Sequence, residues 1–354
     1  MPRMRLAIAA AQRRLGCSMG FAIAAVRAVQ AAAAGLALVV ALGMPSGAAA
    51  QGETRVARVG ALVPSTREAW KENIDAFRVR LRELGWIEGK NLVLDVRYAD
   101  DRYDRLPALA SALVASKPDV IFAGASAATD AARHATTTIP IVFETLGDAV
   151  SLGIVANLAR PGGNVTGISG FSQEQATKRL ELMLQIVPGA KRVGVLANRS
   201  NPATEPIVRA IETAARQLHV DVDTADVRNP DHLESAMKAI AERRTPAFLL
   251  VADPMLFGQT QRIVEIAARL RLAGAGERRE FADSGGLLSY GPSRAEAFQQ
   301  MAAYVDRILR GAKPADLPIE RPTKFELVVN LKTARTLGLA IPQSLLLRAN
   351  DVIQ

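Results

Sequence analysis

The sequence predicts an α/β fold built as two similar lobes with parallel sheets, and three observations predict it. Strand and helix signals alternate strictly along the chain, as in parallel sheets covered by helices on both faces. The alternation restarts midway, where Arg192 to Ala197 (RVGVLA) repeats the pattern of Arg58 to Val63 (RVGALV). The length of 354 residues suits about two domains, and 49% hydrophobic with 22% charged residues excludes a disordered or collagen-like chain.

The first fifty residues are predicted to lie outside this fold. Residues 1–50 carry five arginines and no acidic residue, and they include an apolar run over Ala31–Leu42 and a small-residue stretch before Gln51. This pattern is typical of a secretory signal peptide cleaved near Ala50–Gln51, since the apolar run is shorter than the roughly 20 residues of a membrane span. An uncleaved N-terminal anchor stays open as an alternative.

Removal of that segment changes the charge and the thiol content of the chain. Without its five arginines the formal charge falls from +9 to +4, and the single cysteine, Cys17, is lost. The remaining chain is nearly balanced in charge, which gives no indication of nucleic-acid binding. A cysteine-free exported chain suits an oxidising compartment.

The first lobe is predicted to begin with a buried strand over Arg55–Val63. A helix follows, because Trp70, Ile74, Phe77 and Leu81 recur at steps of four, three and four and so share one face. The elements expected after it are strands at 92–98, 120–123, 139–143 and 165–168 and helices at 106–115, 127–134 and 152–159.

The second lobe is predicted to repeat the design. The expected helices are 173–186, 202–218, 232–243, 257–271, 295–309 and 331–337, and the expected strands are 192–197, 219–227, 247–252, 286–290 and 324–330. We therefore expect a signal peptide over 1–50, an N-terminal lobe over 51–170 and a C-terminal lobe over 171–290. Residues 291–354 are expected to form a crossover helix and a C-terminal segment that packs back across the lobes.

Candidate binding residues follow the predicted strands, because ligands of open parallel sheets sit beyond the carboxyl ends of the strands. The candidates are Ser65, Ser126, Ala127, Thr145, Asp148, Ser169, Asn198 and Asp253. Hydroxyls and helix N-terminal N–H groups suit a carboxylate, and Asp148 or Asp253 suits an ammonium group. The set therefore favours a zwitterion such as an amino acid.

Each of these candidates also has a plainer interpretation. Ser126 could act only as the cap of the following helix, and Asp253-Pro254 could simply start one. Asn198 and Asn201 could be turn residues, and Glu144 is more typical of a solvated or capping acid. The sequence leaves these alternatives open.

The sequence mostly does not match known catalytic and metal-binding motifs. Gly124 to Ala128 has the strand, G-x-S-x-small, helix context of a hydrolase nucleophile. The general base would have to be His219 or His232, which are predicted at the opposite end of the strands. An exported serine hydrolase using Ser126 is thus the alternative function. No G-x-G-x-x-G follows a strand, so no dinucleotide site is predicted.

The prospects for a metal site are poor. The chain has three histidines. The acidic residues Asp100, Asp101 and Asp104 lack the spacing of a calcium-binding loop and are expected in a solvated loop. We expect no metal and no cofactor.

An ordered set of motifs spans nearly all of residues 55–354. The motifs are FRVRLRELGWIEGKN (77–91), YDRLPALA (103–110), DVI (119–121), TIPIVF (138–143), LARPGGNVT (158–166), KRLEL (178–182), REF (279–281), GGLLSYG (285–291), KFELVVNLK (324–332) and IP (341–342). In this order they resemble the ABC-transporter substrate-binding proteins of the TrpX-like family, which have the type I periplasmic-binding fold.

The resemblance implies a periplasmic solute-binding protein with two Rossmann-like lobes that close on a small molecule, without catalysis. The lobes would hinge at three crossovers, near Ser169–Ser172, Tyr290–Pro292 and Pro318–Pro322. Characterised relatives bind aromatic amino acids, particularly tryptophan or tyrosine. The implied partners are the permease and ATPase of an ABC importer, with no nucleic acid, and we expect a monomer.

The resemblance also implies positions for the site. Ser126, Thr145, Asp148 and Ser169 would line the first lobe, and Asn198 and Asp253 the second. Two departures from the family pattern stand out. Asp148-Ala149-Val150 replaces the usual Asp-Pro-Val, and residues 273–278 (AGAGER) replace an apolar strand and are poor in strand formers.

Overall fold

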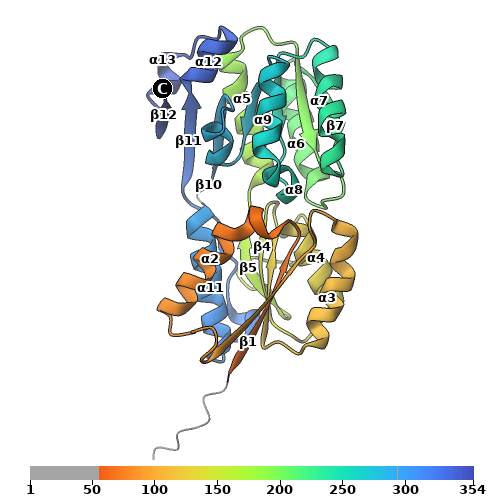
Figure 1. Cartoon of the computed structure of the whole chain (residues 1–354), viewed down its shortest axis with the longest axis vertical. Coiled ribbons are helices and arrows are strands. Elements are labelled where there is room, and N and C mark those ends of the chain that lie inside the picture. The colour runs from red at the N-terminus through yellow and green to blue at the C-terminus, as the bar shows by residue number, and fades with distance from the viewer. Residues whose placement is uncertain (1–55, 293) are drawn as a thin grey trace, which may run out of the picture. The chain divides into compact units, whose positions relative to one another are not determined.

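Two sheets organise the protein, one at the centre of each lobe (Figure 1). The computed structural model describes residues 56–292 and 294–354, except for the side chains of 294–296. The predicted signal peptide, its cleavage site and Cys17 lie outside the described residues.

The first lobe is a five-stranded parallel sheet in the order β2-β1-β3-β4-β5. Its elements are β1 (Ala57–Val63), α2 (Arg67–Glu83), β2 (Leu92–Tyr98), α3 (Leu106–Ala115), β3 (Val120–Gly124), α4 (Ala125–Ala135), β4 (Ile141–Thr145) and β5 (Val165–Ser169). Thr66 caps α2 by accepting a hydrogen bond from the Ala69 N–H at 3.2 Å. The predicted apolar face of α2 is buried, and Phe77 stacks on Phe122 of β3 with ring centroids 5.1 Å apart.

The second lobe is a seven-stranded sheet in the order β12-β11-β10-β9-β8-β6-β7. Its strands are β6 (Arg192–Ala197), β7 (Asp221–Asp226), β8 (Ala247–Leu250), β9 (Ala273–Gly276), β10 (Leu288–Pro292), β11 (Phe325–Asn330) and β12 (Asp351–Ile353). Its helices are α5 (Ser172–Ile186), α6 (Thr204–Gln217), α7 (Leu233–Glu242), α8 (Pro254–Gly258), α9 (Thr260–Arg269), α10 (Arg279–Asp283), α12 (Leu331–Leu337) and α13 (Gln343–Leu346). The predicted pair of α/β lobes with mainly parallel sheets is confirmed, and the second sheet contains one antiparallel pair, β10 with β11.

The antiparallel pair follows from a detour of the chain through the first lobe. After β10 the chain enters α11 (Arg294–Leu309), which packs with α2, β4 and β5. Phe298 of α11 meets Trp70 edge-on with ring centroids 5.7 Å apart. The chain then passes β5, where Glu320 pairs with Ile168, and returns to the second lobe as β11. Because β11 enters from the first lobe, it runs opposite to β10.

The predicted helix over 152–159 is wrong. A single turn ends at Gly153, which has a left-handed φ of +64°, and the Ile154 N–H bonds to the Ala149 carbonyl five residues back at 2.9 Å. This combination is a Schellman-type helix stop. The side chains of Ile154 and Val155 still pack into the first-lobe core. Their apolar character therefore reflects burial and does not indicate a helix.

The unusual 273–278 stretch nevertheless begins with a strand, β9. A Cβ on Gly274 would lie 2.8 Å from Phe281 and from Phe248, and a Cβ on Gly276 would lie 2.5 Å from Phe281. The glycines therefore make room for these two rings, which meet edge-on at 6.2 Å. Pairing with β8 and β10 holds the strand despite its low strand propensity.

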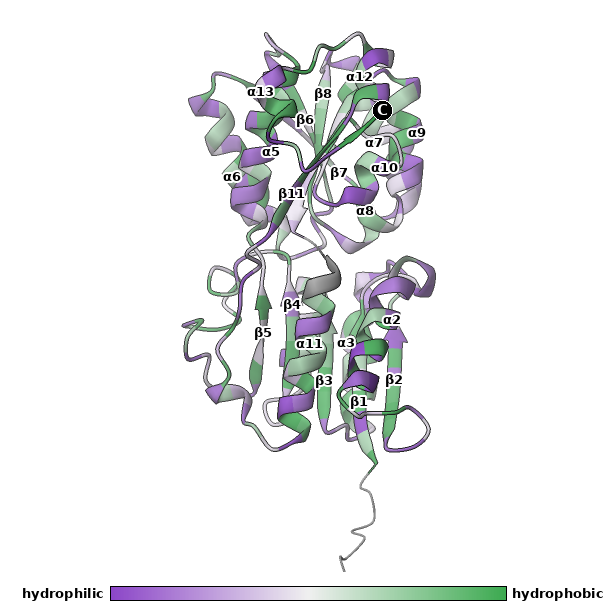
Figure 2. Cartoon of the chain, turned by 90° about the vertical axis from the view of Figure 1, so that its left-hand side faces the viewer, coloured by the Kyte–Doolittle hydropathy of each residue, from purple (hydrophilic) through white to green (hydrophobic). Residues whose placement is uncertain are grey.

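Hydrophobic residues concentrate in the strands, whereas the outward faces of the helices are hydrophilic (Figure 2). This distribution puts a buried core on both faces of each sheet. None of the described helices is long and apolar enough to cross a membrane.

Candidate ligand-binding cleft

The carboxyl ends of the parallel strands in both lobes point toward the junction between the lobes (Figure 1). A small cavity of about 30 Å³ lies there; we call it the inner cavity. Its lining comes from both lobes and comprises Glu144, Thr145, Leu146, Ile168, Gly170, Phe171, Ser172, Gln175, Glu277, Arg278, Pro292, Ala297, Phe298 and Pro322. Of the predicted site residues, only Thr145 lines it.

A larger cavity of about 350 Å³ adjoins the inner cavity and shares Glu277, Arg278, Pro292 and Phe298 with it. Its other lining residues are Glu72, Asn73, Ala76, Arg279, Glu280, Asp283, Gly291 and Glu326. We call it the acidic chamber because five of these twelve residues are acidic. Helix α2 supplies one wall and the β9–α10 region supplies the other, so the chamber also lies between the lobes.

Gln175 is the inner-cavity residue whose environment points most directly to a ligand. Its side chain is 4% exposed, and neither its amide oxygen nor its amide nitrogen has a hydrogen-bond partner among the described residues. A buried amide without partners costs free energy, so such a group in a native structure calls for an explanation. A ligand in the cavity that both donates and accepts a hydrogen bond supplies one.

A buried ion pair lies beside Gln175. The Arg179 guanidinium of α5 is fully buried and lies 3.4 Å from the Glu277 carboxylate, and it donates to the Tyr290 carbonyl at 2.9 Å. Burial lowers the pKa of Arg179, and Glu277 opposes that shift. Ser172 also donates to Glu277, at 3.2 Å. Glu277 is thus fixed at the boundary of the two cavities.

The predicted hydroxyls of the first lobe organise the loop after β4. Ser126 Oγ accepts from the Leu146 N–H at 3.3 Å, and Ser169 Oγ accepts from the Ala149 N–H at 2.9 Å. Thr145 Oγ1 donates to the Gly147 carbonyl at 2.8 Å. The interpretation of Ser126 as a helix cap is wrong, because Gly124 occupies the N-cap position and Ser126 lies inside the first turn.

Asp148 forms an ion pair with Arg321, a residue of the segment that returns from α11 to β11. It also accepts from the Ser151 N–H at 2.7 Å. Burial raises the pKa of this carboxyl. The Ser151 hydrogen bonds and Arg321 together lower it by more, so the net shift of the pKa is downward. Asp148 is therefore a charged partner of the crossover segment, and it does not line the inner cavity or the acidic chamber.

Asp253 is the centre of a network that joins the lobes. It is fully buried and caps α8, and its carboxylate accepts from Tyr103 Oη of the first lobe at 2.8 Å. Asn201 Nδ2 donates to it at 3.0 Å and Asn198 Nδ2 at 3.3 Å. Burial raises the pKa of Asp253, and it raises that of Tyr103 well above its ordinary value.

The plainer interpretation of these second-lobe residues is confirmed. Asp253-Pro254 starts a helix as the plainer interpretation has it, and Asn198 and Asn201 also stabilise their turn by accepting from the N–H groups of Ser200 and Ala203. The Asp253 carboxylate already accepts hydrogen bonds from Tyr103, Asn198 and Asn201, so its role in this structure is to hold the two lobes together.

Asp101 departs from the expected solvated loop. Its carboxyl is buried and accepts from Ser65 Oγ at 2.6 Å. Burial raises its pKa to about 6, with a further contribution from Asp253 across the junction. Ser65 follows the carboxyl end of β1, and its hydroxyl donates to Asp101.

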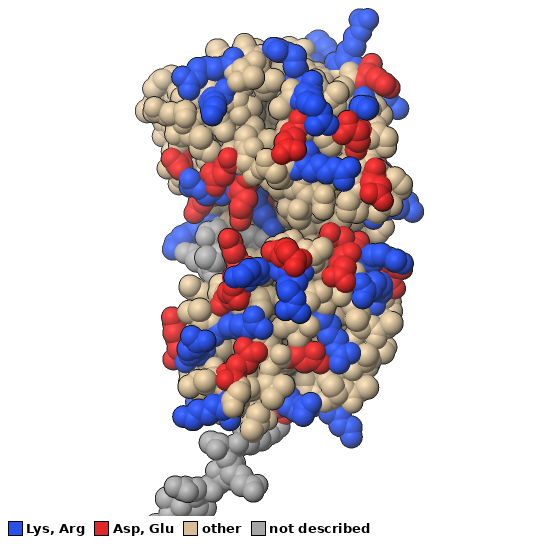
Figure 3. All heavy atoms as spheres, viewed as in Figure 1, with Lys and Arg blue, Asp and Glu red and all other residues tan. Residues whose placement is uncertain are grey.

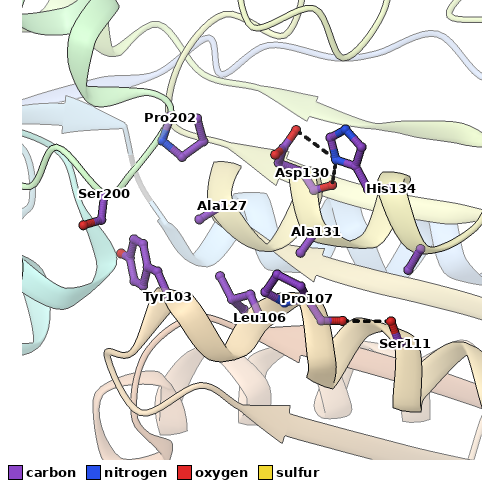
Figure 4. Close-up of a pocket in the computed structure, with 11 residues that line it drawn as sticks. Tyr103, Leu106, Pro107, Ser111, Ala127, Asp130, Ala131, His134, Ser200 and Pro202 are labelled. Carbon is purple, nitrogen blue, oxygen red and sulfur yellow. Dashed lines mark hydrogen bonds and ion pairs between the residues drawn. The ribbon is translucent and has the colours of Figure 1, made fainter.

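Ala127 lines a third cavity, of about 350 Å³, shown in Figure 4. Helices α3 and α4 form its walls, and Tyr103 lies opposite Ser200 and Pro202 of the second lobe. At the far end, His134 Nδ1 lies 2.8 Å from the Asp130 carbonyl oxygen. Its lining is mainly apolar, and the His134–Asp130 pair is exposed. None of its lining residues has a buried side-chain polar atom without a partner.

Phe171, Gln175, Glu277 and Phe298 are among the inner-cavity residues that sequence reasoning missed. Phe171 and Gln175 follow the carboxyl end of β5 at the entry to α5, so the same strand-end rule could have found them. Glu277 follows β9, which was not recognised as a strand. Phe298 comes from the crossover helix, whose contact with the first lobe sets its position.

Two α/β lobes are joined by several chain crossings and enclose partly buried polar cavities at their junction. This is the architecture of a protein that binds a small molecule between its lobes. The serine hydrolase alternative finds no support here, since Ser126 is buried and among the described residues no hydrogen bond joins its hydroxyl to a histidine.

Comparisons with known proteins identify the family. The family model for ABC transporter substrate binding proteins matches residues 58–353, and the chain belongs to this family. A curated relative, the tyrosine-binding protein of Clostridioides difficile (strain R20291), is 24% identical over 276 residues, which is 78% of each chain.

Solved structures show the same fold. A conserved domain protein from Vibrio cholerae is 27% identical with a TM-score of 0.79, covering 84% of this chain and 100% of its own. An ABC domain in complex with L-Trp from Streptococcus pneumonia is 23% identical with a TM-score of 0.76, covering 84% and 99%. The type I periplasmic-binding fold predicted from the sequence is confirmed.

Proposed function

We propose that this protein is exported to the periplasm, where it binds an amino acid, aromatic in side chain, in the cleft between its lobes. It then delivers this ligand to the permease and ATPase of an ABC importer. The observation that carries the ligand-binding part is Gln175, a buried amide with no partner among the described residues, which lines an interlobe cavity together with Phe171, Phe298 and Thr145.

The character of the inner cavity supports an amino acid with an aromatic side chain. Phe171 and Phe298 give its lining an aromatic character, which suits an aromatic ligand. The Gln175 amide, the Thr145 hydroxyl and the Glu277 carboxylate offer directional polar contacts within the same space. The relatives named for tyrosine and found with L-Trp support the same class of ligand.

The rest of the proposal concerns how the protein acts. The basic, acid-free N-terminal segment supports export through a signal peptide. Binding and release by lobe closure require no covalent chemistry, so we propose a non-enzymatic, monomeric carrier.

Titration calorimetry of the chain from Gln51 tests the proposal. L-tyrosine, L-tryptophan and L-phenylalanine are the probes, and L-leucine, D-glucose and benzoate are the controls. The proposal expects saturable one-to-one binding of at least one aromatic amino acid, tighter than that of every control. Binding confined to the sugar or the benzoate would contradict it.

Gln175→Leu is the matched variant for the same titration. This change keeps a side chain of similar size and removes both polar atoms, so affinity for the aromatic amino acid should fall about tenfold or more. Gln259→Leu is the control, since Gln259 lies in the second lobe between α8 and α9 and lines neither the inner cavity nor the acidic chamber.

A further inference from the structure

Helix α5 begins at the wall of the inner cavity. Four of the lining residues, Gly170, Phe171, Ser172 and Gln175, belong to its first turn or to the segment that enters it. A helix of fifteen residues carries a partial positive charge at its N-terminal end, and here that end lies at the cavity. A helix end alone does not make a binding site, so the inference depends on the side chains that accompany it.

Gln175 is the first of two buried side chains of α5 that lack hydrogen-bond partners. It lines the inner cavity and is 4% exposed, and its amide oxygen and nitrogen are both without partners among the described residues. The amide nitrogen can therefore donate to a group that enters the cavity. A carboxylate is the acceptor that gains both from this donor and from the N-terminal end of a helix.

Arg179 is the second of these side chains. It follows Gln175 by four residues, so the two lie one turn apart on the same face of α5. Its guanidinium is fully buried, and within the described part of the chain its Nε and Nη2 atoms have no partner. Its Nη1 atom donates to the Tyr290 carbonyl at 2.9 Å and lies 3.4 Å from the Glu277 carboxylate. Part of the guanidinium is thus available to a further anion.

Glu277 offsets the charge of Arg179 only in part. A strong charge-assisted hydrogen bond between such groups has a length of about 2.7–2.9 Å, so the separation of 3.4 Å indicates a weaker pair. Burial lowers the pKa of Arg179, and the opposing effect of Glu277 does not cancel this shift. Glu144, the other acidic residue of the lining, also has an interaction partner. Positive charge therefore remains to be compensated behind Gln175.

We propose that the N-terminal end of α5 is the carboxylate-binding part of the cleft: the carboxylate of the ligand accepts a hydrogen bond from the Gln175 amide nitrogen, and Arg179 supplies compensating positive charge from one turn behind. The inner cavity, about 30 Å³, has about the volume of one water molecule, so it must widen around the ligand as the lobes open and close. This inference rests on the proposed function and assigns the end of the amino acid that lies against α5.

Three related probes test the inference by calorimetry on the chain from Gln51. L-tyrosine carries an ammonium and a carboxylate. L-tyrosinamide has the same ring and ammonium but a neutral amide at the other end, and 3-(4-hydroxyphenyl)propionate has the carboxylate without the ammonium. We expect L-tyrosinamide to bind at least tenfold more weakly than L-tyrosine, because a hydrogen bond to a charged group is lost, and we expect the propionate to bind measurably.

Gln175→Glu supplies the second readout. The substitution keeps the size of the side chain and places a negative charge where the carboxylate of the ligand would lie. L-tyrosine and the propionate should each bind at least tenfold more weakly to this variant. L-tyrosinamide should lose less affinity than L-tyrosine, since its neutral end is not repelled. A merely structural role of Gln175 would weaken the three probes equally.

Gln217→Glu is the matched control. Gln217 is exposed at the end of α6 and does not line the inner cavity, so the variant adds the same charge elsewhere in the second lobe. Basic and acidic side chains are already interspersed on the face of the protein shown in Figure 3. One more exposed charge should therefore leave the affinity for each probe unchanged.

The outcomes separate the inference from the proposed function. Equal binding of L-tyrosine and L-tyrosinamide, both weakened alike by Gln175→Glu, would overturn the inference and leave amino-acid binding intact. Binding of the propionate without L-tyrosine, lost in Gln175→Glu, would support the inference and contradict the amino-acid proposal. Failure of both carboxylate-bearing probes to bind would overturn the inference as well as tyrosine binding.

Discussion

The Tyr103 hydroxyl of the first lobe donates a 2.8 Å hydrogen bond to the Asp253 carboxylate of the second lobe. The two residues are 150 positions apart in the chain, and Asp253 is fully buried. A buried, charge-assisted hydrogen bond between lobes contributes to their closed arrangement, and it can form only when the lobes are together. Weakening this hydrogen bond should therefore lower the affinity for any ligand that binds as the lobes close.

Tyr103→Phe should weaken ligand binding. The change removes one hydroxyl and leaves the ring in place, so Asp253 loses one hydrogen bond. A hydrogen bond to a charged group contributes about 1.5–3 kcal/mol. Calorimetry with L-tyrosine should show a dissociation constant raised about tenfold or more. Tyr98→Phe, at the end of β2 in the first lobe, is the control and should bind as the unaltered chain does. Unchanged affinity in Tyr103→Phe would show that the bond does not limit closure.

Asp101 should make stability fall as pH rises through about 6. Its pKa in the folded protein, about 6, lies above the ordinary value of 3.8, so the folded state binds more protons between these values. Raising the pH from about 4 to above 6 then costs stability, of order 1 kcal/mol after allowing for solvent screening. Its charged neighbours are Asp253 and Asp100, and Asp100 is itself paired with Arg105.

Urea unfolding at pH 4.5 and pH 7.5 measures this effect. Asp101→Asn keeps an acceptor for Ser65 and cannot ionise, so it should be more stable than the unaltered chain at pH 7.5 and nearly equal to it at pH 4.5. Asp104→Asn is the control, because Asp104 is an exposed partner of Arg102. A difference between Asp101→Asn and the unaltered chain that is the same at both pH values would contradict the titration.

Ser169→Ala should destabilise the loop that follows β4. The substitution leaves the Ala149 N–H without its buried acceptor, which costs about 1–3 kcal/mol. Thermal unfolding should show a lower Tm, and the exposed Ser111→Ala should show little change. An unaltered Tm would mean that another acceptor takes the N–H.

Gly276→Ala should destabilise the second lobe. The added methyl group would lie 2.5 Å from the Phe281 ring, so the ring or the strand must move, at a cost of about 1–3 kcal/mol. The double variant Gly276→Ala with Phe281→Leu should lose less stability than the sum of its single changes, since the smaller side chain relieves the overlap. Additive losses would show that the methyl group and the ring do not compete for space.

Much of the fold could be predicted from sequence because strong periodic patterns coincide with buried faces. Trp70, Ile74 and Phe77 show this for α2, and RVGVLA shows it for β6. Predictions failed where packing overrides local preference. The glycines of β9 form a strand only because Phe248 and Phe281 fill the adjacent space, and the stop at Gly153 depends on backbone conformation that apolar periodicity does not reveal.

The site was harder to predict, because the strand-end rule selects positions without saying what each side chain bonds. Ser126 follows β3 and Ser169 ends β5, and their hydroxyls accept hydrogen bonds from the Leu146 and Ala149 N–H groups. Asp253 is taken by Tyr103. The groups left over for a ligand, Gln175 above all, become visible only when hydrogen-bond partners are assigned in three dimensions.

Hydrogen–deuterium exchange of the chain from Gln51, with and without saturating L-tyrosine, tests most directly whether the ligand binds between the lobes. The account predicts slower exchange in residues 144–148, 170–176 and 276–280, which surround the inner cavity from both lobes. The second lobe has a separate pocket lined by Val264, Asn330 and Thr333 among others. Slower exchange confined to that pocket would place the ligand there and contradict the account.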